Sequence, residues 1–299
     1  MRLPALFVLF CSVALAGCVN QTVNSNSVPA LERSAQPLPE DLLLDVGIAI
    51  FDPGLDDLPE DEDEARLVYP EVRKAESHFM ASRLAETMQN SGVWGAVRVL
   101  PGDQQVVDLM VEGKILHSDG EKLTVHVNAT DARGHNWLDD EYSDTSSAYA
   151  YRVTTRNTYD PFQSLYNRIA NDLVKVLNET PNQALANIRT TAELRFAAEF
   201  SPDAFGNYLE PDKKGRQQIV RLPAEGDPMI ERIRRIRERD RVYIDTLQDY
   251  YANFDDLMRT PYQEWRKLSY EETVALRELE EQARTQLLTG GLAIVAGIL

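Results

Sequence analysis

Six arginines crowd into one short segment near the C-terminus of a chain that is otherwise acidic. They are Arg232, Arg234, Arg235, Arg237, Arg239 and Arg241. Guanidinium groups bind carboxylates and phosphates through charge-assisted, often paired hydrogen bonds. One hypothesis is therefore a docking surface for an acidic partner, or for a phosphate-bearing one such as lipopolysaccharide. The alternative, which we favour, is that the acidic body or the local Glu231, Glu238 and Asp240 neutralise this segment within the chain.

Histidines are the natural candidates for a metal site, and three of the four lie in one region: His117, His126 and His135. The dipeptide Asp119-Gly120 predicts a two-residue hairpin turn that pairs His117 with Lys122. His126 would then stand four residues further along, ~13 Å away at the usual rise of a strand. One ion cannot bridge that distance, so we expect neither a metal site nor a cofactor.

The chain contains none of the motifs that most directly indicate catalysis. It has no Gly-x-Ser-x-Gly, no Gly-x-x-x-x-Gly-Lys and no Gly-x-Gly-x-x-Gly after a strand. Paired carboxylates are so frequent in this acidic sequence that no pair stands out as a general acid and base. We therefore expect a protein that is not an enzyme.

A reactive residue of another kind, Cys18, follows the N-terminal apolar run. Arg2 precedes that run, which extends from Leu6 to Leu15, and small residues then lead into the cysteine as Leu15-Ala16-Gly17-Cys18. This order resembles the signal peptide and lipidation box of bacterial lipoprotein precursors. The run is shorter than the ~20 residues of a permanent membrane helix, so we expect residues 1–17 to be a signal peptide that is removed.

The lipoprotein resemblance implies a location in the cell. Cys18 would carry a diacylglyceryl thioether on its sulfur and an acyl chain on its amine, which together give a stable membrane anchor. In the sorting pattern of Gram-negative lipoproteins, Asp after the cysteine retains the protein in the inner membrane, whereas Val19 and Asn20 follow here. The resemblance therefore implies the outer membrane, with the body facing the periplasm. Residues 18–38 are mostly polar and are expected to form a flexible lipidated tether.

The charge of the chain excludes one class of partner, and its cysteine content excludes an internal disulfide. The precursor has a formal net charge of −17, and removal of Arg2 takes the mature chain to −18 (−17 − 1). So acidic a surface repels nucleic acid, and we expect no nucleic-acid partner. With Cys11 in the expected signal peptide and Cys18 acylated, the mature chain has no pair of thiols for a disulfide.

Residues 39–205 are expected to form an α/β domain closed by helices. The apolar run at 42–51 predicts a buried strand, the pattern at 70–90 predicts a helix, and residues 94–100 predict a second strand. A helix between two such strands is typical of a right-handed crossover between parallel strands.

A β-meander and two helices complete this predicted domain. Alternation of polar and apolar residues predicts antiparallel strands at 109–117, 122–129 and 135–142, with one wet face. An apolar stripe at helical spacing then predicts a helix at 160–178, which should pack on the sheet. After Pro181, a second helical stretch is expected at 183–200.

This order of elements resembles the periplasmic α/β domains of outer-membrane lipoproteins over about residues 42–178. Examples are the curli-secretion lipoprotein family and the lipoprotein activators of penicillin-binding proteins. The resemblance rests on the element order and on a phrase such as Val111-Glu112-Gly113-Lys114-Ile115 before a hairpin. It implies a role in binding other envelope proteins, and it assigns no site residue.

The C-terminal part is predicted to be helical. Residues 206–227 are expected to be a connector, and residues 228–288 a helical arm. Apolar residues from Met229 to Leu257 recur at alternating steps of four and three, which predicts a coiled-coil-like seam. Because Thr260-Pro261 and the capping box at Ser269 predict further helix starts, we expect the arm to be a helical hairpin.

Residues 289–299 form an apolar, Gly-rich tail that is too short to span a bilayer. Ala293 and Gly297 have the small-residue spacing that permits close helix contact in lipid. With Gly290 and Gly291 they form the candidate contact to a membrane or an oligomer. The alternative is that this sequence stops inside a longer apolar segment.

The predicted fold class is α+β: a mixed sheet made of β-α-β and an antiparallel meander, packing helices and a C-terminal helical hairpin. The predicted function is that of a non-catalytic, lipid-anchored binding or assembly factor of the outer membrane. Its partners would be the membrane, other envelope proteins and further copies of itself in a homo-oligomer. Two alternatives stay open: a subunit of a lipoprotein pore or secretion complex whose tail inserts, and a periplasmic hydrolase acting on cell-wall or lipid substrates.

Overall fold

The computed structural model describes residues 28–33, 38–56, 68–102, 106–151 and 160–296, with side chains up to residue 287. Cys18, the predicted signal peptide and Gly297 lie outside the described residues. In chain order the elements are η1 (Glu40–Leu42), β1 (Val46–Ala49), α2 (Pro70–Ser91), β2 (Val97–Leu100), β3 (Leu109–Ser118), β4 (Lys122–Asp131), β5 (Asn136–Thr145), α3 (Gln163–Glu179), α4 (Asn182–Phe200), α5 (Pro202–Phe205), β6 (Leu209–Pro211), β7 (Gln217–Ile219) and α6 (Pro228–Ala296).

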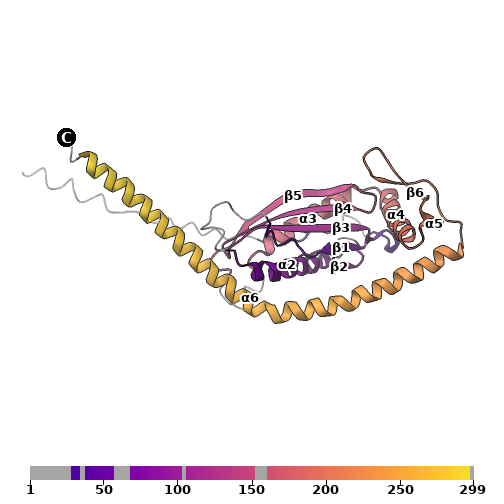
Figure 1. Ribbon diagram of the computed structural model, residues 1–299, viewed down its shortest axis with the longest axis horizontal. Coiled ribbons are helices and arrows are strands. Elements are labelled where there is room, and N and C mark those ends of the chain that lie inside the picture. The colour runs from indigo at the N-terminus through magenta and orange to yellow at the C-terminus, as the bar shows by residue number, and fades with distance from the viewer. Residues whose placement is uncertain (1–27, 34–37, 57–67, 103–105, 152–159, 297–299) are drawn as a thin grey trace, which may run out of the picture.

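A five-stranded mixed sheet forms the centre of the body, in the order β2-β1-β3-β4-β5 (Figure 1). Strand β1 is parallel to both β2 and β3, while β3, β4 and β5 form an antiparallel meander. Helix α2 connects the neighbouring parallel strands β1 and β2, as the predicted crossover requires. The protein is therefore α+β, with the mixed sheet that the sequence predicts.

The apolar face of the sheet is covered by α2 and α3. In β4, Leu123, Val125, Val127 and Ala129 are buried, and the alternating positions Thr124, His126 and Asn128 are partly exposed. The buried residues share one core with Met80 and Leu84 of α2 and with Ile169 and Leu173 of α3. This arrangement confirms the predicted wet face of the meander, since period-two alternation sends successive side chains to opposite faces.

Part of the predicted tether is held against the body. In residues 28–33, the main-chain oxygens of Pro29 and Ala30 accept hydrogen bonds from the side-chain amides of Asn167 and Asn171, at 2.7 and 2.9 Å. Asn171 Oδ1 in turn accepts from the main-chain nitrogen of Glu32 at 2.8 Å. The asparagines on α3 thus satisfy the main chain of a segment that has no secondary structure of its own.

The closing helix α4 and the connector form the end of the body near the start of α6. Residues 206–227 contain a small hairpin, in which β6 pairs antiparallel with β7. A second apolar cluster lies here, where Ala197 and Phe205 pack against Ile230 and Ile233 of α6. The first turns of α6 are therefore fixed to the body by ordinary apolar packing.

The predicted C-terminal hairpin is wrong, because Pro228–Ala296 is one continuous helix, α6. Its 69 residues correspond to a length of about 100 Å. It runs along the body, bows around it and then projects beyond it (Figure 1). Pro261 lies inside α6, where it removes one main-chain hydrogen bond and permits bending without ending the helix. Ser269 does not cap a new helix, because its hydroxyl donates to the main-chain oxygen of Asp119 at 2.7 Å.

The predicted seam also does not match the face of α6 that the body covers. Ile233 is buried as expected, but Tyr243, Tyr250 and Leu257 are 60%, 68% and 70% exposed. The body instead buries Ile244 and Tyr262, together with the charged side chains of Asp255 and Arg266. A hydrophobic periodicity could not reveal this face, since much of it is charged.

Candidate functional site

Two groups of charged and polar side chains join α6 to the body. The candidate functional site consists of these two groups together with the helix. The proximal cluster consists of Asp45, Arg98, Asp108, Arg237, Arg241, Asp245 and Gln248. The distal cluster consists of Arg73, Glu76, Ser118, Asp160, Tyr262 and Arg266. Within each cluster the residues of α6 are three or four positions apart, and Gln248 and Tyr262 are separated by about four full turns, so all of them lie on one face of the helix.

The parallel strands place the two carboxylates of the proximal cluster side by side. Val46 of β1 lies opposite Leu109 of β3, so the preceding residues, Asp45 and Asp108, stand together at the ends where both strands begin. The main-chain nitrogen of Asp45 donates to Asp108 Oδ2 at 2.9 Å. Two carboxylates at one sheet end form a natural site for the arginines of a crossing helix.

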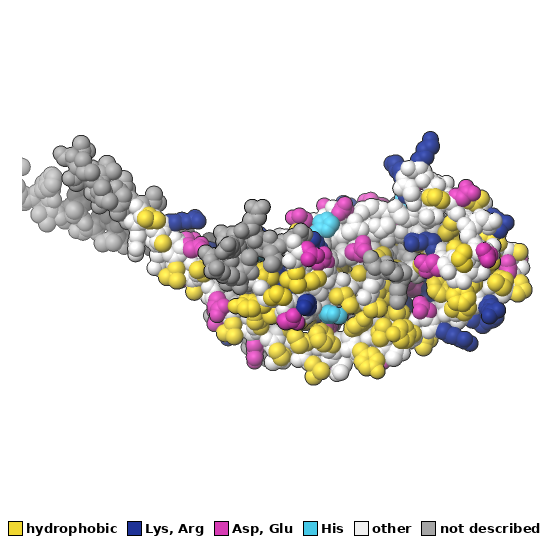
Figure 2. All heavy atoms as spheres, in the orientation of Figure 1, with side chains coloured by type: hydrophobic (Ala, Val, Ile, Leu, Met, Phe, Trp, Pro, Cys, Tyr) yellow, Lys and Arg dark blue, Asp and Glu magenta, His cyan; other side chains and the backbone are white. Residues whose placement is uncertain are grey.

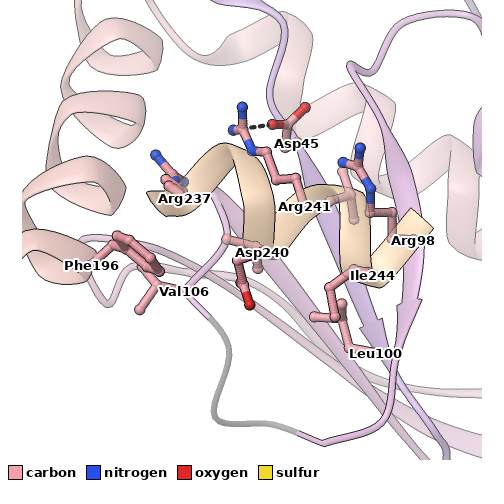
Figure 3. A pocket seen from close by; sticks show the side chains of 11 residues that line it. Asp45, Arg98, Leu100, Val106, Phe196, Arg237, Asp240, Arg241 and Ile244 are labelled. Atoms are coloured by element: carbon pink, nitrogen blue, oxygen red, sulfur yellow. Dashed lines mark hydrogen bonds and ion pairs between the residues drawn. The ribbon is translucent and has the colours of Figure 1, made fainter. Parts of the chain in front are cut away.

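Ion pairs join α6 to this end of the sheet. Arginines of the helix bind carboxylates of the body, and an arginine of the body binds a carboxylate of the helix. Arg241 Nη2 donates to Asp45 Oδ2 at 2.6 Å, and Figure 3 shows this pair above the helix. Arg237 Nη2 lies 3.8 Å from Asp108 Oδ1. Arg98 of β2 reaches the other way, with Nε 2.6 Å from Asp245 Oδ1 of α6. Helix and body each contribute both positive and negative partners to these ion pairs, and this pattern fixes the helix in one register.

Burial affects the charged groups of the proximal cluster. Asp108 is only 2% exposed, and its burial raises the pKa of the carboxyl, although the hydrogen bond from Asp45 and the nearby Arg237 oppose this shift. Burial likewise lowers the pKa of Arg237, against the raising effect of Asp108. The neighbouring cleft of about 430 Å³ includes equal numbers of basic and acidic residues: Arg189, Arg234, Arg237 and Arg241 with Asp41, Asp108, Glu193 and Glu238. Its charge is balanced, so it does not select an anion.

Gln248 connects α6 to the edge of the sheet. The main-chain nitrogen of Val99 donates to Gln248 Oε1 at 2.8 Å, and Gln248 Nε2 donates to the main-chain oxygen of Val99 at 2.9 Å. Strand β2 is an edge strand, whose unpaired main-chain groups would otherwise offer a template for another strand. The side-chain amide of Gln248 thus makes the two hydrogen bonds with Val99 that the main chain of a neighbouring strand would otherwise make.

The distal cluster is centred on Arg266, whose side chain is 1% exposed. Its guanidinium donates to both carboxylate oxygens of Asp160, at 2.7 and 3.2 Å. The same guanidinium lies over the Tyr262 ring, 4.3 Å from its centroid. A buried cation is costly unless it is paired, and here one carboxylate and an aromatic face compensate it.

Glu76 of α2 forms the second half of the distal cluster. The hydroxyls of Ser118 and Tyr262 donate to its Oε1 at 2.7 and 2.8 Å, and Arg73 Nε lies 3.6 Å from its Oε2. Burial raises the pKa of Glu76, although Arg73 and both hydroxyls favour its charged form. For Arg266, burial opposes the charge, but Asp160 and Tyr262 outweigh it and the pKa rises.

The β3–β4 turn packs directly beneath α6 at this place. Gly120 has φ +81°, and a Cβ there would lie 2.4 Å from the main-chain oxygen of Arg266. Asp119-Gly120 is a turn, as predicted, but the register differs, because Ser118 pairs with Leu123 and His117 with Thr124. Glycine is thus required at position 120 for two reasons: the backbone there is left-handed, and the helix approaches too closely to leave room for a side chain.

The structure divides the six predicted arginines into two groups. Arg237 and Arg241 belong to the proximal cluster, and Arg234 pairs with Glu193 and Glu231, both at 2.6 Å. Arg232, Arg235 and Arg239 are exposed and form no ion pair with any residue that the structure describes. Intramolecular neutralisation therefore accounts for half of the arginines, and the other half face outward.

From residue 278 to residue 287 the side chains of α6 project away from the described part of the body. Arg277 pairs with Glu121 at 2.7 Å, and every residue from 278 to 287 is exposed. Leu279 and Leu287 are 62% and 76% exposed. Gly290, Gly291 and Ala293 lie in the last turns of α6. Among the described helices, none has a segment long and apolar enough to cross a membrane.

The histidines of the meander occupy separate positions. His117 pairs with Asp119 at 2.8 Å, and His126 pairs with Asp139 of β5 at 2.9 Å. Within the described ranges, no three His, Cys, Asp or Glu side chains are grouped so that they could hold a metal ion.

Comparisons with known proteins give little further guidance. No family model matches this chain, and no curated protein matches it either. Among solved structures, a dodecamer of a PelC variant from Paraburkholderia phytofirmans is 18% identical, with a TM-score of 0.28 over 49% of this chain and 93% of that chain. Another PelC dodecamer from the same organism is 16% identical, with a TM-score of 0.26 over 50% and 97%. At these TM-scores the likeness establishes neither a shared fold nor a shared function.

Sequence reasoning missed the residues that hold α6 in place. Asp45, Gln248 and Arg266 stand in no motif, and their partners lie far away in the chain. One signal was available: polar and apolar residues together recur every three or four positions from Ile230 to Ser269. A search for apolar residues alone overlooks such a mixed face.

Proposed function

We propose that the protein is a lipid-anchored, non-catalytic assembly factor of the outer membrane, with its body in the periplasm and α6 as its binding arm. The observation that carries this proposal is the segment of α6 after Arg277, which leaves the body as a helix with exposed leucines. The acylated Cys18 would hold the body near the membrane. The arm would then reach other envelope proteins.

The physical argument concerns the stability of the projecting segment. An isolated helix shorter than about 12–15 residues is only marginally stable in water, and most helices in proteins are stabilised by packing of an apolar face. Residues 278–287 have no such packing in the body, yet Leu279 and Leu287 present apolar side chains. Contact with a partner would bury these leucines and stabilise the helix.

The rigid attachment of α6 supports the same role. The proximal and distal clusters fix the helix at two places along its length, and within the proximal cluster Gln248 also fixes it to the edge of the sheet. The direction of the projecting segment is therefore set by the body. A binding arm with a fixed direction loses less conformational entropy on binding than a flexible one.

The anchor is tested by Cys18→Ala. The unsubstituted protein should fractionate with the outer membrane, and the variant should move to the soluble fraction. Cys11→Ala is the matched control, because that residue lies in the expected signal peptide and should leave fractionation unchanged. A Cys18→Ala protein that still fractionates with the outer membrane contradicts the anchor.

The arm is tested by photo-crosslinking in intact cells. A photoreactive residue at Leu279 or Leu287 should form adducts with envelope proteins, whereas one at the exposed Lys213 of the β6–β7 loop should not. Deletion of residues 289–299 separates the alternatives, since detergent-resistant oligomers that vanish on deletion would favour the pore-subunit function. Adducts at Lys213 as abundant as those at Leu279 would contradict a specific arm.

A further inference from the structure

An uninterrupted row of exposed side chains runs along α6, away from the body-facing residues. From the N-terminal end it contains Arg232, Arg239, Tyr243, Tyr250, Leu257, Glu264, Leu268 and Glu271, which we call the outer row. At 3.6 residues per turn these positions lie within about a quarter of the helix circumference. The outer row therefore forms a single strip that could contact one partner along its length.

The middle of the outer row is apolar. Tyr243, Tyr250 and Leu257 are all at least 60% exposed, and Leu268, which lies between the two glutamates, is 59% exposed. Figure 2 shows hydrophobic side chains along the lower edge of the molecule, where Figure 1 places α6. Large exposed apolar side chains on one side of a helix favour an interface there, and tyrosine is enriched at such sites.

The two ends of the outer row carry opposite charges. Arg232 and Arg239 lie before the apolar part, and Glu264 and Glu271 lie at its other end. Arg232, Arg239 and Glu264 pair with no other residue in the described ranges, and Glu271 has only Lys267 at 4.0 Å. The outer row is thus basic at one end, apolar in the middle and acidic at the other end. When two copies of the row run in opposite directions, the basic end of each faces the acidic end of the other.

We propose that the outer row binds a second copy of this chain, with the two α6 helices antiparallel. One register satisfies both charge pairs, because Arg239 with Glu264 and Arg232 with Glu271 share the same midpoint, between Tyr251 and Ala252. A two-fold axis at that midpoint forms each pair twice and brings the tyrosines and Leu257 together. A parallel arrangement would instead place arginine against arginine and glutamate against glutamate.

The geometry of α6 ranks the two charge pairs. Figure 1 shows that α6 is convex on the side away from the body. Two convex helices related by a two-fold axis diverge with distance from that axis, which here passes through the midpoint. Arg239 and Glu264 lie nearer that point than Arg232 and Glu271, and they should contribute more. Such pairs at the edge of an interface mainly set orientation and register, while the apolar part provides most of the affinity.

This inference rests on the proposed function in that α6 is a binding element, and it names one partner. It concerns the middle of α6, whereas the proposed envelope contacts use the segment after Arg277. Loss of self-association would therefore leave crosslinking at Leu279 intact, and loss of the envelope contacts would leave self-association intact.

Cysteine crosslinking of the purified full-length chain tests the arrangement. Within one chain, residues 239 and 264 are separated by about 37 Å of helix, so cysteines there cannot join intramolecularly. A chain with Arg239→Cys and Glu264→Cys should form covalent dimers on mild oxidation. Each single variant should not, because its two copies of the same position lie far apart in an antiparallel pair. The unsubstituted chain controls for Cys11 and Cys18.

Charge reversal provides a second measurement that does not involve cysteine. By light scattering, the unsubstituted chain should have the mass of a dimer, Arg239→Glu should dissociate it at least tenfold more readily, and Arg239→Glu with Glu264→Arg should restore it. Lys213→Glu, a matched charge reversal away from α6, should have no effect. Dimers of the single-cysteine chains, a monomeric unsubstituted chain, or no restoration by the double reversal would each overturn the proposal.

Discussion

Gln248 and Val99 share two hydrogen bonds, through which a side chain of α6 satisfies both main-chain groups of an edge-strand residue. The main chain of Val99 would otherwise lie at the open side of β2. The helix therefore protects the sheet edge as well as packing against the body. This contact belongs to the proximal cluster, and together with the distal cluster it makes α6 part of the domain over most of its length.

Replacement of Gln248 should weaken this edge contact. Gln248→Ala removes both hydrogen bonds with Val99 and should lower the free energy of unfolding by about 1–2 kcal/mol. Urea denaturation measures the change. Gln263→Ala is the matched control, since Gln263 is an exposed glutamine on the same helix and should change stability by less than about 0.5 kcal/mol. Equal effects of the two substitutions would show that the hydrogen bonds with Val99 contribute nothing.

Replacement of Arg266 should be much more damaging than removal of a surface charge. Arg266→Met leaves the buried Asp160 without its partner, which should cost about 3–5 kcal/mol of unfolding free energy. Arg266→Met with Asp160→Asn should recover part of that loss, because no unpaired charge is then buried. Lys267→Met, on the exposed side of the same turn, is the control. A loss no larger than that of Lys267→Met would contradict the role assigned to the distal cluster.

Substitution of Gly120 should destabilise the protein both through backbone strain and through a steric clash, and a comparison with Gly215 distinguishes the two effects. Gly120→Ala introduces a side chain at φ +81° and a Cβ 2.4 Å from the main-chain oxygen of Arg266, so α6 must shift. Gly215→Ala introduces similar strain at φ +78° but meets no atom within 4 Å. We expect the second variant to lose about 1 kcal/mol and the first at least twice that. Hydrogen exchange should show faster opening of residues 262–273 only for Gly120→Ala.

Asp255 should make stability depend on pH. It is 4% exposed, and burial raises the pKa of its carboxyl from 3.8 to about 6, against the lowering effects of Ser82 and Arg83. A carboxyl with a raised pKa binds more protons in the folded than in the unfolded chain, so its ionisation lowers stability as pH rises from about 4 through 6. At neutral pH this penalty is on the order of 2–3 kcal/mol.

Asp255→Asn removes that penalty. The variant should be more stable than the unsubstituted chain at about pH 7.5, and the difference should shrink to near zero at about pH 4. Urea denaturation at both pH values measures it. The exposed neighbour Asp256→Asn controls for the general loss of a negative charge. A difference that stays constant between the two pH values would contradict a raised pKa at Asp255.

The sheet and its helices were predictable because their signals are local. Alternation in β4, the turn residues Asp119 and Gly120, and the apolar stripe of α3 each follow from neighbours within a few positions. The order of these elements then leaves few possible topologies, since a crossover helix between two strands makes them parallel. The hairpin register differs from the predicted one, and a register shift between Ile115 and His117 interrupts the regular pairing of β3 with β4.

The C-terminal arm shows why local signals can mislead. Thr260-Pro261 and Ser269 resemble helix starts, yet Tyr262 and Arg266 hold the helix on the body across this region, and Ser269 bonds to Asp119 instead. Tertiary contacts worth several kcal/mol outweigh the cost of a proline and the preference of a capping residue. The apolar seam was real as a pattern, but its exposed members face away from the body.

The sequence by itself determined the α+β class, the order of the strands along the chain, the meander with one wet face and a basic segment in an acidic protein. Only the tertiary structure decided that α6 is one helix, that Arg237 and Arg241 turn inward while Arg232 and Arg239 face outward, and which face stays exposed. The physical reason is the range of the interactions. Periodicity and turn chemistry act within a few residues, whereas ion pairs such as Asp45 with Arg241 depend on where the fold brings distant segments together.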